Sequence, residues 1–61
     1  YALDLLDVLD EKSRAIVILR FFEDRTLAEI ADIMQMNLNT VKTRLYTALR
    51  TLRRELDKTG R

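Results

Sequence analysis

The sequence has 61 residues, no cysteine, histidine or proline, one glycine, and a formal net charge of only +1. A chain of this length forms one small domain, and the missing residue types exclude disulfides, structural zinc and imidazole chemistry. The scarcity of Gly and Pro favours helices over a sheet, and no apolar run approaches the roughly 20 residues of a membrane span, so we expect no membrane insertion.

Residues 2–9 predict a short first helix, because their apolar side chains form one stripe: Ala2, Leu5, Leu6 and Leu9. Asp10 can cap a second helix over residues 11–24 by accepting the free amides of its first turn. That helix carries one apolar face of Ala15, Ile18, Leu19 and Phe22. Val17 and Phe21 lie on nearly the opposite side. A helix that is apolar on two sides packs on two sides, against the first helix or another protein.

A capping box predicts the start of a third helix, since Thr26 is followed three residues later by Glu29. That helix covers residues 27–34 and keeps one side apolar: Leu27, Ile30, Ala31 and Met34. Residues 35–37 interrupt it, and Asn37 can cap a last helix that runs to about Leu56. The apolar row of the last helix falls within roughly 100° of a helical wheel: Val41, Leu45, Ala48, Leu49, Leu52 and Leu56.

Charge divides the chain into two parts. Residues 1–36 carry eight acids and four bases, a net charge of −4, whereas residues 37–61 carry seven bases and two acids, a net charge of +5. The outward side of the last helix is polar and basic, with these residues on it and its flanks: Asn39, Lys42, Thr43, Arg44, Tyr46, Thr47, Arg50, Arg53 and Arg54. A basic surface of this kind indicates a polyanionic partner.

The eight-residue helix, three-residue turn and long helix predict a helix-turn-helix over residues 26–56, with Ala31 and Val41 at the close crossing. The alternative is an ordinary solvated helix side with salt bridges. Acids are too few here for i to i+4 pairing, and the polar residues at the helix start are short hydrogen-bonding types. A helix in the major groove presents its first turns to base edges and its flanks to phosphates, so the pattern favours DNA binding.

The segments "TLAEIADIM", "NTVKTRL" and "ALRTLRREL", at these spacings, resemble region 4 of bacterial sigma-70-type initiation factors, most closely the extracytoplasmic-function group. The match covers about residues 3–56. It implies a compact all-α four-helix domain, here over residues 1–61, with a helix-turn-helix and a long C-terminal recognition helix. It also implies binding to the double-stranded promoter −35 element, docking on the β flap of RNA polymerase core, masking by an anti-sigma factor, and a cytoplasmic location. We expect the chain, which begins at Tyr1, to be a fragment of a longer sigma factor.

The resemblance also implies functions for individual residues. Lys42, Thr43 and Tyr46 would contact bases. The residues expected on the DNA backbone are Asn39, Thr40, Arg44, Arg50 and Arg53, although Thr40 suits a first-turn cap equally well. Val17 and Phe21 are expected to bind a protein partner. Three positions depart from the family pattern: Asp10 and Gln35 stand where Pro and Gly are usual, and Thr47 stands in place of a frequent Arg.

Two other functions remain open. A response-regulator output domain of the LuxR type shares the "EIA…TVK" pattern, but usually has His at the position of Arg44 and a shorter last helix. A pure protein-interaction module would use the apolar excess of the first two helices. Nothing supports an enzyme, because no His, Cys or Gly-rich loop is present and the pairs Asp4/Asp7 and Glu29/Asp32 suit solvated helix faces. No catalytic residue, cofactor or metal is therefore expected.

Overall fold

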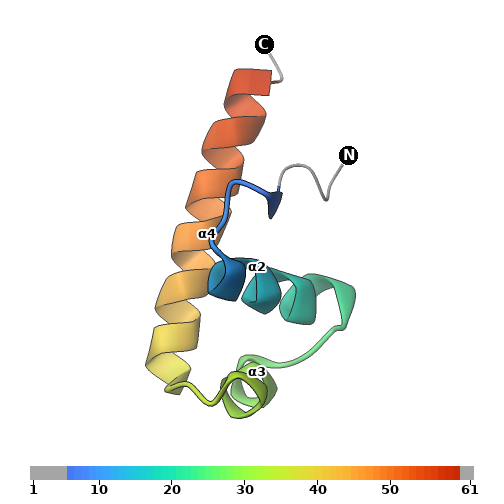
Figure 1. Cartoon of the computed structure of the whole chain (residues 1–61), viewed down its shortest axis with the longest axis vertical. Helices are drawn as coiled ribbons and strands as arrows, with labels where there is room; N and C mark the ends of the chain where they lie inside the picture. The colour runs from blue at the N-terminus through green and yellow to red at the C-terminus, as the bar shows by residue number, and fades with distance from the viewer. Residues whose placement is uncertain (1–5, 60–61) are drawn as a thin grey trace.

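The computed structural model describes residues 6–59, with the backbone alone at Thr59. Its helical segments are α2 (Glu11–Val17), the π-helical η1 (Ile18–Phe22) that continues α2, α3 (Leu27–Met34) and α4 (Leu38–Thr59). Helix α4 runs along the long axis of a molecule that measures 38 × 19 × 16 Å, and α2 and α3 pack against its N-terminal half (Figure 1). The C-terminal turns of α4 extend beyond both of them (Figure 1).

The all-α prediction is confirmed, since residues 6–59 contain helices and no strand, but a separate first helix is not. Of the predicted stretch 2–9, residues 2–5 lie outside the described part. Leu6 is helical, and a turn follows, closed by a 3.0 Å hydrogen bond from the Leu9 N–H to the Leu6 carbonyl. The turn still directs Leu6 and Leu9 inward, where they are 4% and 7% exposed.

Every described element except η1 contributes buried side chains to the core. The apolar side chains of η1 that pack against the core, Ile18 and Leu19, are only partly buried. Its buried apolar residues are Leu6, Leu9, Ile16, Val17, Ile30, Val41, Leu45 and Ala48. Ile16 of α2, Ile30 of α3 and Val41 of α4 are each 0% exposed, so these three helices share one fully buried centre. At the crossing of α3 and α4, Ile30 is the buried residue of α3, and Ala31, expected there, is only partly buried. This centre fixes α4 on the domain.

The predicted apolar face of the second helix is confirmed only in part: Ile18 and Leu19 pack against the core and are partly buried. Ile16 and Val17 are buried, Ala15 is half-buried, and Phe22 is 59% exposed. The π-helical widening at η1 explains part of the difference, because a helix with more residues per turn no longer follows a 100° wheel. Val17 therefore belongs to the core, although it was expected on an outer face, whereas Phe21 is 55% exposed as expected.

Local signals at the helix ends are mostly confirmed. Thr26 and Glu29 form the capping box, and the Asn37 carboxamide oxygen accepts a 2.8 Å hydrogen bond from the Asn39 N–H. Gln35 ends α3 in the left-handed conformation, with φ 56° and ψ 46°. Asp10 occupies the N-cap position of α2 with extended dihedrals, but its side chain makes no capping hydrogen bond. The prediction that its carboxylate caps the helix is wrong; the carboxylate lies near the Ser13 side chain and 3.5 Å from the Arg44 guanidinium.

Candidate nucleic-acid interface

The buried row of α4 determines which of its side chains face outward. Val41, Leu45 and Ala48 are 0%, 5% and 1% exposed, so their side of the helix is fixed against α2 and α3. The Asn37 cap holds the first turn in place. The residues that this arrangement leaves exposed on the outer side are Asn39, Thr40, Lys42, Thr43, Tyr46, Thr47, Arg50, Arg53 and Arg54.

The three residues expected to contact bases lie together on this surface. Lys42 and Thr43 follow one turn after the helix start, and Tyr46 lies one turn further with 55% of its surface exposed. At 3.6 residues per turn, Lys42 and Tyr46 point in nearly the same direction. The set therefore combines a cation, a hydroxyl and an aromatic ring with a polar tip, all of which can make contacts in a DNA groove.

Four of the predicted residues also line one shallow hollow, with a volume of about 380 Å³: Asn39, Thr40, Thr43 and Arg44. Their side chains offer hydroxyl, carboxamide and guanidinium donors, the groups that proteins use for phosphate oxygens. Arg50 and Arg53, which were also expected on the DNA backbone, lie further along α4 and are exposed there. The hollow and the basic row form one continuous helical side.

Arg44 differs from the other basic residues of α4 because an acid lies beside it. Its Nη1 lies 3.5 Å from Oδ2 of Asp10, and the two side chains are 38% and 60% exposed. The neighbouring Ser13 side chain first, and the charge of Arg44 to a smaller extent, lower the pKa of Asp10. The carboxylate is therefore ionised at neutral pH and adjacent to a residue expected to contact DNA. This pair was not predicted from the sequence, since the two residues are 34 positions apart.

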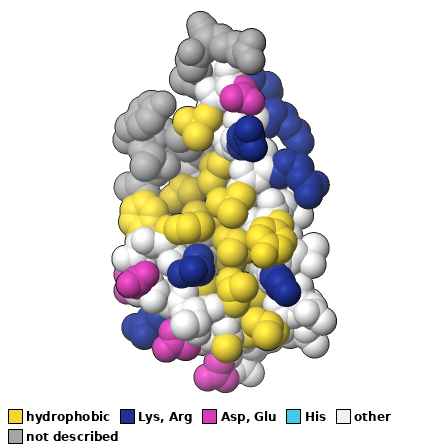
Figure 2. All heavy atoms as spheres, turned by 180° about the vertical axis from the view of Figure 1, so that it is seen from behind, with side chains coloured by type: hydrophobic (Ala, Val, Ile, Leu, Met, Phe, Trp, Pro, Cys, Tyr) yellow, Lys and Arg dark blue, Asp and Glu magenta, His cyan; other side chains and the backbone are white. Residues whose placement is uncertain are grey.

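An apolar groove lies on the other side of α4. It has a volume of about 310 Å³ and is lined by Leu6, Val17, Phe21, Phe22, Leu49, Leu52 and Leu56. Val17, although buried, forms part of its floor, so both residues expected to bind a partner line the groove. The Arg20 guanidinium lies 5.8 Å from the centre of the Phe21 ring. Hydrophobic side chains gather in a band on one face of the molecule, with Lys and Arg side chains along the edge beside it (Figure 2).

Most of the groove was not predicted from the sequence, because Phe22, Leu49, Leu52 and Leu56 were expected to pack inward; Leu49 and Leu52 do pack against the core, but they also line the groove. Leu56 is 45% exposed, since α4 extends beyond the helices that would cover it. The exposure of Leu56 could have been predicted from its position, because it lies about four turns beyond Val41, whereas α3 has only eight residues.

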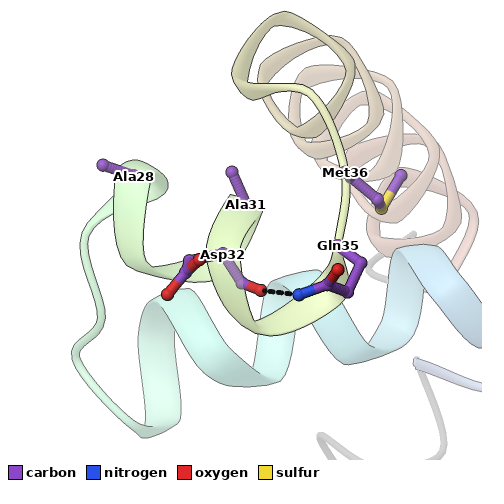
Figure 3. Close-up of a pocket in the computed structure, with 5 residues that line it drawn as sticks. All are labelled: Ala28, Ala31, Asp32, Gln35 and Met36. Carbon is purple, nitrogen blue, oxygen red and sulfur yellow. Dashed lines mark hydrogen bonds between the residues drawn. The ribbon is translucent and has the colours of Figure 1, made fainter.

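A third hollow, of about 450 Å³, lies over α3 and the turn, lined by Ala28, Ala31, Asp32, Gln35 and Met36. Figure 3 shows the Gln35 side chain turned toward Asp32, whose carbonyl accepts a 3.1 Å hydrogen bond from Gln35 Nε2. The charged group of this hollow is a carboxylate, which would repel a phosphate, so this surface does not extend the basic side of α4.

Within residues 6–59, no group of three or more acidic, His or Cys residues is arranged to hold a metal ion. In the same part of the chain, no helix has the length and apolar character needed to cross a membrane.

The family described as "Sigma-70, region 4" matches residues 5–54. The chain belongs to the region 4 family of sigma-70 factors. It is 55% identical over 58 residues to the RNA polymerase sigma factor SigV of Bacillus subtilis. The aligned region covers 90% of this chain and 35% of the relative. The chain is 42% identical over 55 residues to the RNA polymerase sigma-E factor of Streptomyces avermitilis, covering 90% of this chain and 31% of the relative. No solved structure matches the chain.

A further region 4 relative, the ECF RNA polymerase sigma factor SigW of Bacillus subtilis, is 33% identical over 48 residues and covers 79% of this chain and 26% of the relative. The predicted resemblance to the extracytoplasmic-function group is thus confirmed. Region 4 is a family of DNA-binding domains and not of enzymes, and the match favours the sigma interpretation over the LuxR-type and pure interaction alternatives. The chain spans about a third of the length of these curated relatives.

Proposed function

We propose that this chain is the domain of an extracytoplasmic-function sigma factor that binds the −35 element of promoter DNA. The observation that carries the proposal is the outer side of α4 in a region 4 chain. Its first turns present Lys42, Thr43 and Tyr46 outward, while Val41 and Leu45 on the opposite side are buried. A helix held in this way can enter the major groove without disturbing the core.

The two kinds of contact have different effects. Lys42, Thr43 and Tyr46 at the base edges select the sequence, because each base pair presents a distinct set of donors and acceptors in the major groove. Contacts to phosphates supply most of the affinity and orient the helix. These contacts come from the hollow beside the helix start and from the basic row, at Asn39, Thr40, Arg44, Arg50 and Arg53.

The apolar groove is the proposed contact with protein partners: the β flap of RNA polymerase core, or an anti-sigma factor that competes with it. Phe21, Phe22 and Leu56 are 55%, 59% and 45% exposed and line one concave apolar surface. Exposed apolar surface concentrated in this way on a small domain is typical of a protein–protein contact. The groove and the DNA-binding side occupy different sides of α4, so one domain can bind both partners together.

The proposal is tested by measuring the binding of the 61-residue chain to short duplexes over a range of salt concentrations, after selection of a preferred duplex from a random pool. Neutralisation of four to five phosphates predicts a log–log slope with a magnitude of about 3–5. Selection should enrich one asymmetric element bound by a monomer. A binding constant independent of salt, or a pool without enrichment, would refute groove binding, and a palindrome bound by a dimer would favour the LuxR-type alternative.

A further inference from the structure

We propose that Asp10 is a built-in competitor that holds Arg44 back from the DNA backbone. The inference rests on the proposed function, because it concerns one of the residues expected to contact phosphates. Oδ2 of Asp10 lies 3.5 Å from Nη1 of Arg44, within reach of an ion pair. A phosphate that approaches Arg44 therefore encounters a guanidinium that already has an acidic partner.

The position of Arg44 makes the competition direct. Its side chain lines the hollow with Asn39, Thr40 and Thr43, on the side of α4 proposed to face DNA. It is 38% exposed, and the Asp10 side chain beside it is 60% exposed, so both groups are accessible to solvent. On binding, Arg44 must either leave Asp10 or bring that carboxylate close to a phosphate, and each alternative opposes binding.

An opposite effect must also be considered. Asp10 could instead help binding by holding the Arg44 side chain in one orientation, which would reduce the entropy lost on contact. An exposed pair of this kind is too weak to immobilise a long side chain fully, so the saving is smaller than the full cost of ordering Arg44. The repulsion between a carboxylate and the DNA has no such compensation. We therefore expect removal of the Asp10 charge to strengthen DNA binding.

The chain contains a matched control for this substitution. Asp7 lies in the same segment before α2, and its Oδ1 lies 3.7 Å from Nη1 of Arg14, a residue that does not line the hollow. Asp7→Asn and Asp10→Asn change the net charge by the same amount, so the difference between them removes the effect of net charge, and the Arg44→Gln background then isolates contact with Arg44. Asn is also a favourable N-cap residue, so Asp10→Asn should leave α2 folded, which circular dichroism can verify.

The experiment measures fluorescence anisotropy of a labelled mixed-sequence duplex with the 61-residue chain at several salt concentrations. The variants are Asp10→Asn, Asp7→Asn, Arg44→Gln and the double variant Asp10→Asn/Arg44→Gln. Asp10→Asn should bind about two- to fivefold more tightly than Asp7→Asn, the range expected from an exposed ion pair. Its salt slope should rise in magnitude by up to about one, because Arg44 becomes free to neutralise a phosphate. In the Arg44→Gln background, Asp10→Asn should strengthen binding no more than Asp7→Asn does in the parent.

Three results would overturn the inference: equal effects of Asp10→Asn and Asp7→Asn, an undiminished effect of Asp10→Asn without Arg44, or weaker binding by Asp10→Asn. The last result would assign Asp10 the orienting effect. If the parent chain binds no duplex even at low salt, the proposed function fails and this inference fails with it. If the parent binds and only the predicted difference is missing, the inference alone fails.

Discussion

Two reciprocal hydrogen bonds join Thr26 and Glu29 at the start of α3, each from the backbone amide of one residue to the side chain of the other. The Thr26 hydroxyl oxygen accepts a 3.1 Å hydrogen bond from the Glu29 N–H, and Oε1 of Glu29 accepts a 2.9 Å hydrogen bond from the Thr26 N–H. Two amides that a helix start would leave unpaired are satisfied in this way. Because α3 leads through a short turn into α4, this pair fixes the start of the predicted helix-turn-helix.

Thr26→Ala should lower the free energy of unfolding by about 1 kcal/mol, within the range of about 0.5–2 kcal/mol for loss of an N-cap. The loss should appear in urea denaturation as a lower midpoint with an unchanged slope. Thr43→Ala is the control, since Thr43 is exposed inside α4 and alanine has the higher helix propensity. If Thr26→Ala were as stable as Thr43→Ala, the capping box would contribute nothing to stability.

Glu29 should make stability depend on pH. The hydrogen bond from the Thr26 N–H lowers the pKa of Glu29 below the ordinary value of 4.5. A group with a lowered pKa in the folded state stabilises the fold above its unfolded pKa, and this contribution is lost as the pH falls through the folded pKa. The Tm should therefore fall as the pH drops below about 4.5. Asp10, whose pKa is also lowered, contributes with the same sign.

Glu29→Gln separates the two carboxylates, because glutamine can still accept the Thr26 amide but does not titrate in this range. Between neutral pH and pH 3, the Tm of the variant should fall by less than the Tm of the parent chain. An identical pH profile in the two proteins would show that Glu29 has the same pKa folded and unfolded, contrary to its hydrogen bond.

Replacement of Gln35 by glycine should give a more stable fold than its replacement by alanine. It has φ 56° and ψ 46°, where a Cβ atom costs roughly 1 kcal/mol. Both variants lose the hydrogen bond from Gln35 Nε2 to the Asp32 carbonyl, so their difference isolates the backbone. Thermal unfolding should rank Gln35→Gly above Gln35→Ala by about 1 kcal/mol. The reverse order would contradict the left-handed conformation.

The sequence predicted those features that depend on local chemistry or an unbroken period. The capping box at Thr26, the cap at Asn37 and the buried residue Val41 follow from residue type and spacing, and all are confirmed. The exposure of Phe22 could not be predicted with a fixed wheel, because η1 changes the helical period after Val17. The pair of Asp10 and Arg44 depends on tertiary packing alone, which no local pattern encodes.

Phe21→Ser should weaken binding to a protein partner and leave the fold nearly as stable as before. Phe21 is 55% exposed and lines the groove, so its replacement should cost less than about 1 kcal/mol of stability, compared with about 2–5 kcal/mol for Ile30→Ala in the core. The measurements are thermal unfolding and a pull-down with the β flap.

Ile33→Ser is the matched control for the pull-down. Ile33 is an apolar residue of α3, 52% exposed, and does not line the groove. The variant should retain partner binding. A large drop in Tm for Phe21→Ser would mean that Phe21 supports the fold. Equal pull-down by both variants would place the partner contact outside the groove.

The proposed division of α4 into base contacts and phosphate contacts predicts two different defects. Lys42 lies one turn into the helix, at the depth where side chains reach base edges, whereas Arg50 lies more than two turns further along the exposed basic row. Lys42→Ala should therefore affect sequence preference, and Arg50→Ala should affect general affinity. Both residues are exposed, so neither substitution should disturb the core.

The central claim, that the first turns of α4 select the DNA sequence, is tested most directly by measuring the affinities of these two variants for the preferred duplex and its single-base-pair variants. Lys42→Ala should reduce discrimination by about 1–3 kcal/mol at one or two base pairs. Arg50→Ala should weaken binding to every duplex about equally and lower the magnitude of the salt slope by about one. A uniform loss of affinity in Lys42→Ala, with every base preference retained, would contradict the account.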